Sequence, residues 1–216
     1  MTMPRVKVCG ITRTEDALLA AELGASAIGL IFWPGSPRCV EFRVAREIVA
    51  ALPAHVVSVG VFVDQPRDDV QDISRQVQLG AVQLHGHEPL DYAAALMEPV
   101  IKAIAVNDRF DVALLQAIPE TITVLLDAHD PVKRGGTGRT IDWTRAAEAA
   151  ATRPVILSGG LNADNVDDAI RTVHPYGIDL SSGVEASPGV KDHAKLRALF
   201  AALENRPSER AARTRI

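Results

Sequence analysis

Residues 14–31, TEDALLAAELGASAIGLI, contain one copy of the helix-to-strand joint that decides the fold. The Ala- and Leu-rich first part predicts an amphipathic helix near 14–23, and the apolar run after Gly24 predicts a strand near 27–32. Glycine at such a joint can adopt the left-handed conformation that ends a helix and turns the chain back. Comparable joints occur at Gly80 and Gly177, which indicates that one helix–strand unit repeats along the chain.

Eight strands alternate with eight helices in this interpretation. The strands are expected near 5–9, 27–32, 56–63, 81–85, 100–105, 121–127, 154–158 and 177–181. The helices are expected near 14–23, 43–52, 67–78, 89–97, 111–117, 142–151, 164–173 and 192–203. Each unit then has about 27 residues, close to the minimum for a strand, a helix and two short loops.

The fold class that we expect is α/β, as a single (β/α)8 TIM barrel over residues 1–203. Near-continuous apolar strands indicate a parallel sheet covered by helices, and eight units can close into a barrel. A doubly wound open sheet is the alternative, but it carries its phosphate-binding glycines in the first strand-to-helix turn. Here that turn reads CGIT at 9–12, which is no dinucleotide fingerprint. Residues 204–216, with four arginines, are expected to form a solvated C-terminal tail.

The composition excludes several classes of protein. Hydrophobic residues make up 47% and charged residues 23% of the chain, as in ordinary globular proteins. A formal net charge of -4 gives no general attraction to nucleic acid or to an anionic membrane. No apolar run approaches the ~18 residues of a membrane span, and two cysteines are too few for a disulfide framework. We therefore expect a cytoplasmic protein without nucleic-acid or membrane partners.

Polar residues at the carboxyl ends of the predicted strands are the first functional signal. The active sites of TIM barrels lie at this end, and residues two apart on a strand share a face. Polar side chains that point into an otherwise apolar barrel are costly to bury and need a reason. The residues that this parity groups are Lys7 with Cys9, Gln83 with His85, Leu125 with Asp127, and Asp179 with Ser181.

Three loops of small residues are the second signal: GGTG at 135–138, SGG at 158–160 and SSGVE at 181–185. Glycine lets backbone N–H groups approach an anion closely. TIM barrels often bind phosphate after the last two strands, sometimes with a short extra helix after the eighth. One such loop alone is as easily a simple turn. The three together favour a phosphate site.

Three single residues are candidates for the chemistry. Cys9 is either a small buried hydrophobe or a thiol that faces substrate, in which case Lys7 would lower its pKa and let it remove a proton from carbon. Asp127 either tethers a loop or acts as an acid in an apolar pocket. Arg38 either lies in solvent or binds a carboxylate through two hydrogen bonds.

Two further features are interpreted as structural. Cys39 lacks the setting of a reactive thiol. His85 and His87 suggest a metal site, but no further His, Glu or Asp accompanies them at ligand spacing, and no metal is expected.

Taken in order, the motifs resemble those of the phosphoribosylanthranilate isomerases, the barrel enzymes of the tryptophan pathway. They are VKVCGIT (6–12), FWPGSPR (32–38), VGVFV (59–63), VQLHG (82–86), LD (126–127), GGTGRTIDW (135–143), LSGGL (157–161) and DLSSGVE (179–185). The resemblance extends in order and spacing from residue 5 to about residue 203.

The resemblance implies an Amadori rearrangement of an aminoaldose phosphate to an aminoketose phosphate, with no metal or redox cofactor. It implies that Asp127 is the general acid, that Cys9 is the general base and that Arg38 binds the substrate carboxylate. The residues that it assigns to the phosphate site are Gly136, Gly138, Ser158, Gly159, Gly160, Ser182 and Gly183. Those that it assigns to the pocket lining are Gln83, His85, Asp179 and Ser181. The partner would be a small sugar phosphate, and the enzyme a monomer or a homodimer.

Four residues beside the catalytic pair, Trp33, Gly35, Cys39 and Arg139, depart from those more frequent in the family. They leave loop closure and substrate affinity open. A ribulose-phosphate epimerase is an alternative that would carry a metal-binding His and Asp set. A histidine-pathway aminoaldose isomerase would have an aspartate in place of Cys9. A barrel that binds a phosphorylated metabolite without turnover is the alternative outside the enzymes.

Overall fold

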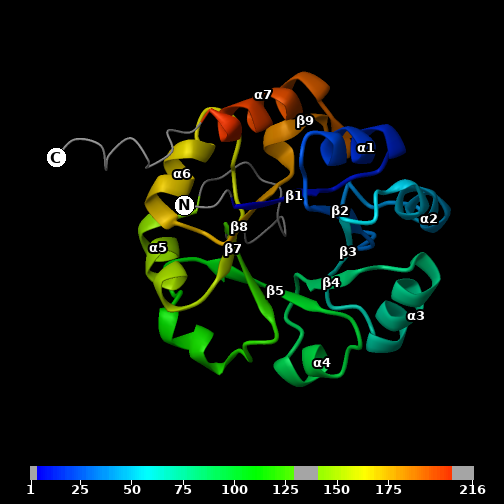
Figure 1. The fold of residues 1–216 in the computed structure, drawn as a ribbon. Coiled ribbons are helices and arrows are strands. Elements are labelled where there is room, and N and C mark those ends of the chain that lie inside the picture. Colours follow the sequence, from blue (N-terminus) through cyan, green and yellow to red (C-terminus); the bar gives the residue numbers. More distant parts are fainter. Residues whose placement is uncertain (1–3, 129–140, 206–216) are drawn as a thin grey trace.

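Eight parallel strands close into a barrel, in which each strand is hydrogen-bonded to the next in sequence and β8 returns to β1 (Figure 1). The computed structural model describes residues 4–128 and 141–205. The strands are β1 (Arg5–Cys9), β2 (Ala27–Ile31), β3 (Val57–Phe62), β4 (Ala81–Leu84), β5 (Val100–Val106), β6 (Thr123–Ala128), β7 (Val155–Leu157) and β8 (Gly177–Leu180). The expected α/β TIM barrel is confirmed, and each strand lies within about two residues of the stretch that the apolar pattern predicts.

Helices surround the barrel and cover the outer faces of its strands (Figure 1). They are α1 (Thr14–Glu22), α2 (Phe42–Ala51), α3 (Arg67–Val77), α4 (Leu90–Ala94), α5 (Trp143–Thr152), α6 (Val166–Val173) and α7 (His193–Glu204). The expected helix near 111–117 is instead the 3-10 helix η1 (Val112–Ala117). Ile118 after it is extended, as is typical of a residue before proline, and Pro119 follows, so this segment has no room for a regular α-helix.

The helix-to-strand joints use left-handed residues, but not always the expected glycines. Gly24 after α1 has a φ of 109°, as expected. After α3 and α6 the left-handed residues are Gln78 (φ 62°) and His174 (φ 54°), so the prediction for the glycines two and three residues later is wrong. One of these, Gly177, lies against a neighbouring strand, where a Cβ would come within 3.1 Å of the Arg5 carbonyl oxygen. It provides space between two strands rather than a turn.

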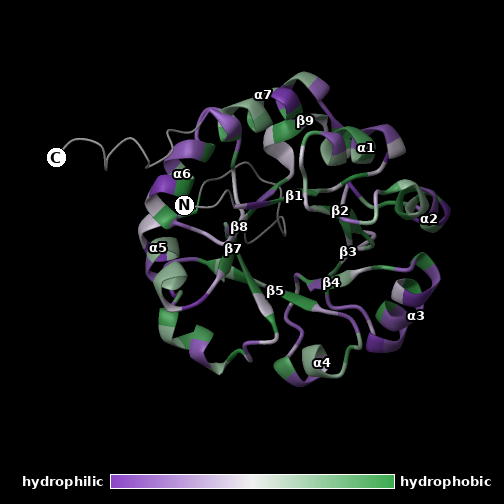
Figure 2. Ribbon diagram, viewed as in Figure 1, coloured by the Kyte–Doolittle hydropathy of each residue, from purple (hydrophilic) through white to green (hydrophobic). Residues whose placement is uncertain are grey.

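The apolar core has one layer inside the barrel and another between the strands and the helices. The fully apolar inner cluster is small, and its buried members are Val59, Ala81, Ile101 and Leu125. The larger outer cluster contains the alternate residues of the same strands, such as Val82 and Val124. Figure 2 shows the strands as mostly hydrophobic and the helices as mixed. The polar residues that alternation along the strands predicts on one face therefore lie on the inner face of the folded barrel.

A short helix and a hairpin lie between β8 and α7. They are the 3-10 helix η2 (Ser182–Val184) and the antiparallel strands β9 (Glu185–Ser187) and β10 (Val190–Lys191). A short helix after the eighth strand occurs in other TIM barrels. The hairpin is not predicted from the sequence, because strands of three and two residues are too short to show an alternating pattern. The backbone N–H of Lys191 donates to Asp16 in α1 at 3.0 Å, which fixes the hairpin to the first helix.

Residues 1–3, 129–140 and 206–216 lie outside the described residues. The GGTG loop at 135–138, Arg139 and most of the expected C-terminal tail are among them. No helix of the described residues is long and apolar enough to cross a membrane.

Candidate active site

A pocket lies at the carboxyl ends of the strands. Its apolar lining comes from β2, β3 and the segments that follow them, and its polar lining comes mainly from β1, β4, β6 and β8. The predicted site residues that line it are Cys9, Arg38, Gln83, His85, Asp127, Ser158, Asp179 and Ser181. The fold therefore brings the candidate acid and the candidate base, from β6 and β1, to one pocket.

A buried ion pair joins the first and last strands beside this pocket. The Lys7 Nζ lies 2.9 Å from Asp179 Oδ1, and the two side chains are 4% and 6% exposed. Gly29 in β2 is in register with Cys9, and a Cβ there would come within 2.6 Å of Cys9 Sγ and 3.0 Å of Lys7 Nζ. The missing side chain at Gly29 thus leaves the space in which the thiol and the ammonium group lie together.

Burial and charge act in opposite directions on the Cys9 thiol. Burial raises the pKa of Cys9, whereas the cations Lys7 and Lys191 favour the thiolate and Asp179 disfavours it. Lys7 therefore acts in the expected direction, but burial outweighs it, and the pKa of the thiol is raised rather than lowered. Burial alone would lower the pKa of Lys7, but Asp179 and Cys9 more than compensate and raise it, so Lys7 remains a cation.

Asp127 is hydrogen-bonded to His85, which is itself bonded to Gln83. His85 Nε2 lies 3.1 Å from Asp127 Oδ2, and Gln83 Nε2 lies 2.9 Å from His85 Nδ1. When the Gln83 amide donates to Nδ1, the proton of the neutral ring is on Nε2 and is donated to Asp127. Gln83 Oε1 and Ser181 Oγ are buried without a partner among the described residues. Such atoms in a pocket lining indicate where a ligand can bind.

Arg38 is buried at the pocket, not solvated, and Glu185 holds it there. Its Nε and Nη2 donate to the two carboxylate oxygens of Glu185 at 2.9 and 2.7 Å. A Cβ on Gly10 would come within 2.7 Å of Arg38 Cδ, so the glycine lets the side chain cross the end of β1. Among the described residues no group accepts from Nη1, which leaves this edge of the guanidinium for a ligand.

Lys191, which sequence reasoning missed, lies next to this pair. Its Nζ donates to the carbonyl oxygens of Cys9 (2.6 Å) and Ser181 (3.2 Å) and to Glu185 Oε1 (2.9 Å). Burial alone would raise the pKa of Glu185, but Arg38 and Lys191 outweigh it and lower it. Glu185 lies in the quoted SSGVE motif, whereas nothing in the sequence pattern singles out Lys191.

A second hollow adjoins the pocket and is lined by the loops at 158–160 and 181–183. A Cβ on Gly183 would overlap the Leu161 carbonyl oxygen, so the two loops approach as closely as a glycine allows. Around this hollow, the backbone N–H groups of Gly159, Gly160, Ser182 and Gly183 donate to no described residue. Unbonded N–H groups around a hollow are suited to an anion such as phosphate. Gly136 and Gly138, assigned to the same site by resemblance, lie outside the described residues.

The other residues singled out in the sequence have simpler surroundings. In the described part of the chain no three His, Cys, Asp or Glu side chains are placed to hold a metal ion. His87 is 85% exposed and lies 3.5 Å from Asp64. The Cys39 thiol is exposed and does not line the pocket, while its backbone N–H donates to the Ser36 carbonyl oxygen at 3.0 Å. A Cβ on Gly35 would overlap the Trp33 ring. These two departures from the family pattern are therefore linked, because the ring packs in the space that the glycine leaves.

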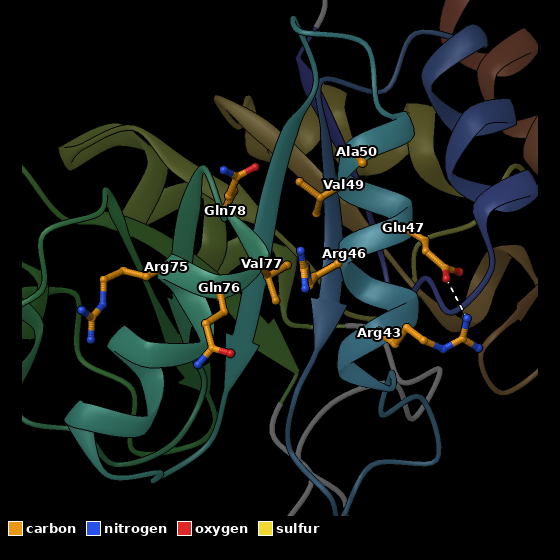
Figure 3. A pocket seen from close by; sticks show the side chains of 9 residues that line it. All are labelled: Arg43, Arg46, Glu47, Val49, Ala50, Arg75, Gln76, Val77 and Gln78. Carbon is orange, nitrogen blue, oxygen red and sulfur yellow. Dashed lines mark hydrogen bonds and ion pairs between the residues drawn. The ribbon is translucent and has the colours of Figure 1, made fainter.

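A separate groove lies in the outer helical layer, between α2 and the end of α3 (Figure 3). Arg43 pairs with Glu47 at 2.7 Å along α2, and Arg75 pairs with Asp72 along α3. Figure 3 shows Arg75 pointing away from Arg43 and Arg46. Exposed cations with partners on their own helices are usual on a surface, and no strand end reaches this groove. The barrel mouth is therefore the candidate active site.

The closed (β/α)8 barrel places the chain in the class of TIM-barrel proteins, and its acidic, thiol and cationic groups lie at the end of the barrel where TIM-barrel enzymes have their active sites. The family model of N-(5'-phosphoribosyl)anthranilate (PRA) isomerase matches residues 6–202. The chain belongs to this family, which confirms the resemblance drawn from the motifs.

Individual relatives agree over nearly the whole chain. It is 47% identical over 202 residues to the isomerase of Chromohalobacter salexigens, covering 93% of this chain and 94% of that one. It is also similar to the crystal structure of the enzyme from Thermus thermophilus, with 43% identity, a TM-score of 0.86, and 93% and 98% of the two chains covered. A further isomerase structure, in complex with reduced 1-(o-carboxyphenylamino)-1-deoxyribulose 5-phosphate, has 40% identity, a TM-score of 0.82, and coverage of 94% and 99%.

Proposed function

We propose that the chain converts N-(5-phospho-β-D-ribosyl)anthranilate to 1-(2-carboxyphenylamino)-1-deoxy-D-ribulose 5-phosphate in the biosynthesis of tryptophan. One observation carries the proposal: Cys9 and Asp127 line the same pocket, and this pocket adjoins a hollow lined by unbonded backbone N–H groups. The isomerase of 40% identity that binds a reduced form of this product supports the same assignment.

The substrate has two anionic ends, and the site offers a place for each. The phosphate would accept hydrogen bonds from the N–H groups of the loops at 158–160 and 181–183, and from Gly136 and Gly138 as the family resemblance implies. The carboxylate would accept hydrogen bonds from the free edge of Arg38. With both ends bound, the ribose lies in the pocket that Cys9 and Asp127 line.

The first step would open the ribose ring. Asp127 donates its proton to the ring oxygen, the bond between that oxygen and C1 breaks, and the nitrogen lone pair forms a C=N bond. The product is an open-chain iminium ion. The Asp127 carboxylate left behind accepts the His85 Nε2 proton in a hydrogen bond at 3.1 Å, which stabilises the charge that develops there.

The second step would remove a proton from C2. The positive iminium acidifies this C–H bond, so that the Cys9 thiolate is a sufficient base. The C–H electrons form a C1=C2 double bond and the C=N electrons return to nitrogen, which gives an enolamine. Transfer of a proton to C1 and loss of the hydroxyl proton at C2 then yield the aminoketose. Lys7, beside the sulfur, stabilises the thiolate against the burial that disfavours it.

Turnover of fluorescent phosphoribosylanthranilate by the purified protein tests the proposal. The replacements Cys9→Ala and Asp127→Asn should each abolish turnover while the fold is retained. Cys39→Ala and Asp164→Asn, which alter an exposed thiol and an exposed carboxylate, are matched controls and should retain it. Near-normal turnover in either active-site variant would remove that residue from the mechanism.

The same turnover experiment distinguishes an isomerase from a barrel that binds a phosphorylated metabolite without catalysis. A barrel that only binds a phosphorylated metabolite would bind the substrate or a product analogue without turnover, and it would fail to rescue a tryptophan auxotroph that lacks this isomerase. Rescue by the wild-type chain but not by Cys9→Ala would support catalysis by this site in a cell.

We further propose that the enzyme works in the cytoplasm as a monomer or a homodimer. A net charge of -4 and the absence of a spanning helix among the described residues are consistent with this. A structure from Thermotoga maritima with 39% identity is described as monomers generated from a dimeric isomerase. Light scattering after size exclusion measures the oligomeric state directly.

A further inference from the structure

A buried group of three charged side chains lies behind the pocket edge, and two of them take no part in the steps above. Arg38, Glu185 and Lys191 are 8%, 6% and 2% exposed. They come from the loop after β2, from β9 and from β10. Two cations and one anion give the group a net positive charge, placed where the substrate carboxylate would bind.

Lys191 has the hydrogen-bond pattern of an ammonium group. Its three acceptors, the carbonyl oxygens of Cys9 and Ser181 and a carboxylate oxygen of Glu185, match the three N–H bonds of a protonated amine. A neutral amine has two N–H bonds and would direct its lone pair at one of these oxygens. Burial lowers the pKa of Lys191, and the Glu185 carboxylate opposes this change.

Glu185 has two opposing effects on ligand binding by Arg38. It occupies Nε and Nη2 and so leaves the Nη1 edge of the guanidinium for a ligand. It also places a negative charge next to the guanidinium, which would weaken the attraction for a ligand carboxylate. Lys191, bonded to the same carboxylate at 2.9 Å, offsets that charge while the geometry is kept.

We propose that Lys191 is a positioning residue that sets the preference for substrates with a carboxylate: through Glu185 it leaves Arg38 a net positive charge at the pocket edge. It does so without touching the ligand, since its own side chain is fully buried. This inference rests on the proposed function, because it takes Arg38 to be the group that binds the carboxylate.

Two ligands separate this role from a structural one. The first is reduced 1-(2-carboxyphenylamino)-1-deoxyribulose 5-phosphate, and the second is its counterpart with a phenyl group in place of the carboxyphenyl. Calorimetry gives a dissociation constant for each ligand. The dissociation constant of the phenyl ligand divided by that of the carboxyphenyl ligand measures the contribution of the carboxylate. In Lys191→Met this ratio should fall about tenfold, while the ligand without the carboxylate binds within about twofold of its wild-type affinity.

Lys195→Met is the matched control. Lys195 lies four residues further along, donates to the backbone carbonyl of Glu185 at 2.8 Å and is exposed, so its loss removes a charge that solvent screens. The ratio should be unchanged in this variant. In Lys191→Met/Glu185→Gln the ratio should return toward that of the wild type, because the charge that Lys191 offsets is gone. If Lys191→Met does not fold, Lys191→Gln, which keeps an N–H donor, takes its place.

An unchanged ratio in Lys191→Met, or an equal loss of affinity for both ligands, would overturn the inference and leave Lys191 a structural tie between β1, β8 and the hairpin. These outcomes leave the proposed function intact. Binding of neither ligand by the wild-type protein would instead refute the proposed function, and this inference with it.

Discussion

The ammonium group of Lys7 and the carboxylate of Asp179 lie 2.9 Å apart across the seam where the first strand meets the last. Lys7 also lies beside the Cys9 sulfur, in space left by Gly29. The ion pair therefore spans the strand pair that closes the barrel and places a cation beside the candidate base. Its loss should affect both stability and reactivity, and the two effects can be separated.

Lys7→Met should lower the free energy of unfolding by about 3–5 kcal/mol near pH 7, because it leaves Asp179 as an uncompensated buried charge. Burial raises the pKa of Asp179, so the carboxylate can be neutralised as the pH falls, and the deficit should be smaller at pH 5 than at pH 7. Urea unfolding at the two pH values measures this.

The double variant Lys7→Met/Asp179→Leu is the control. It should regain most of the stability, since no charge is left unpaired, but not the turnover, since the cation beside Cys9 is still missing. A single variant as stable as the wild type, or a double variant with full turnover, would contradict this account.

The pH dependence of Cys9 alkylation should show that this thiol ionises only at high pH. Because burial raises its pKa above the ordinary value of 9.0, the rate of reaction with iodoacetamide should still be rising as the pH passes 9. A Cys39→Ser background removes the exposed second thiol. A rate that levels off below pH 8.5 would show that the cations outweigh burial.

The architecture and the inward-facing residues could be predicted because both follow from local patterns. A strand shows its apolar run, and alternation along it decides which side chains share the barrel interior. Cys9, Gln83 and Asp127 were found in this way. The resemblance then supplied their proposed roles, which strand parity alone does not provide.

Ion pairs and hydrogen bonds between residues far apart in the sequence could not be predicted in the same way. Lys7 and Asp179 are separated by 172 residues and meet only because the barrel closes. The bonds from Glu185 to Arg38 and to Lys191 depend on a hairpin whose strands are too short to show a pattern. The raised pKa of Cys9 likewise depends on how deeply the thiol is buried, which the proximity of Lys7 in the sequence does not reveal.

Gln83→Leu should lower kcat about tenfold and raise KM by a smaller factor, because the unpartnered Gln83 Oε1 also faces the pocket. The amide that faces His85 Nδ1 would be lost, and the ring would no longer be held with its Nε2 proton on Asp127. Gln71→Leu, which removes an exposed amide from α3, is the control and should leave both constants unchanged. Steady-state kinetics of the two variants measures this, and an effect on KM alone would show that Gln83 contacts substrate rather than orienting His85.

Two ion pairs on the chain should differ strongly in their effect on stability. Lys102 and Glu88 lie 2.7 Å apart with side chains 8% and 2% exposed, and Glu88 also accepts the Asp64 and Gly86 N–H groups. Lys102→Met should therefore cost about 3–5 kcal/mol, because it leaves a buried carboxylate without its cation. Arg43→Met, at the exposed pair with Glu47, should change the free energy of unfolding by less than about 0.5 kcal/mol. Equal effects in chemical denaturation would contradict the difference in burial.

Gly183→Ala should weaken phosphate binding strongly, while the protein still folds. The added Cβ would overlap the Leu161 carbonyl oxygen, so the loops at 158–160 and 181–183 must move apart, and their N–H groups would no longer converge on one hollow. Inhibition of turnover by inorganic phosphate should become at least about tenfold weaker, as expected when several N–H donors lose their geometry together. Gly80→Ala is the control, because its Cβ would lie 3.1 Å from Val57 Cγ1, at the start of β4 and away from the pocket. Equal inhibition constants for Gly183→Ala and the wild type would place the phosphate elsewhere in the barrel mouth.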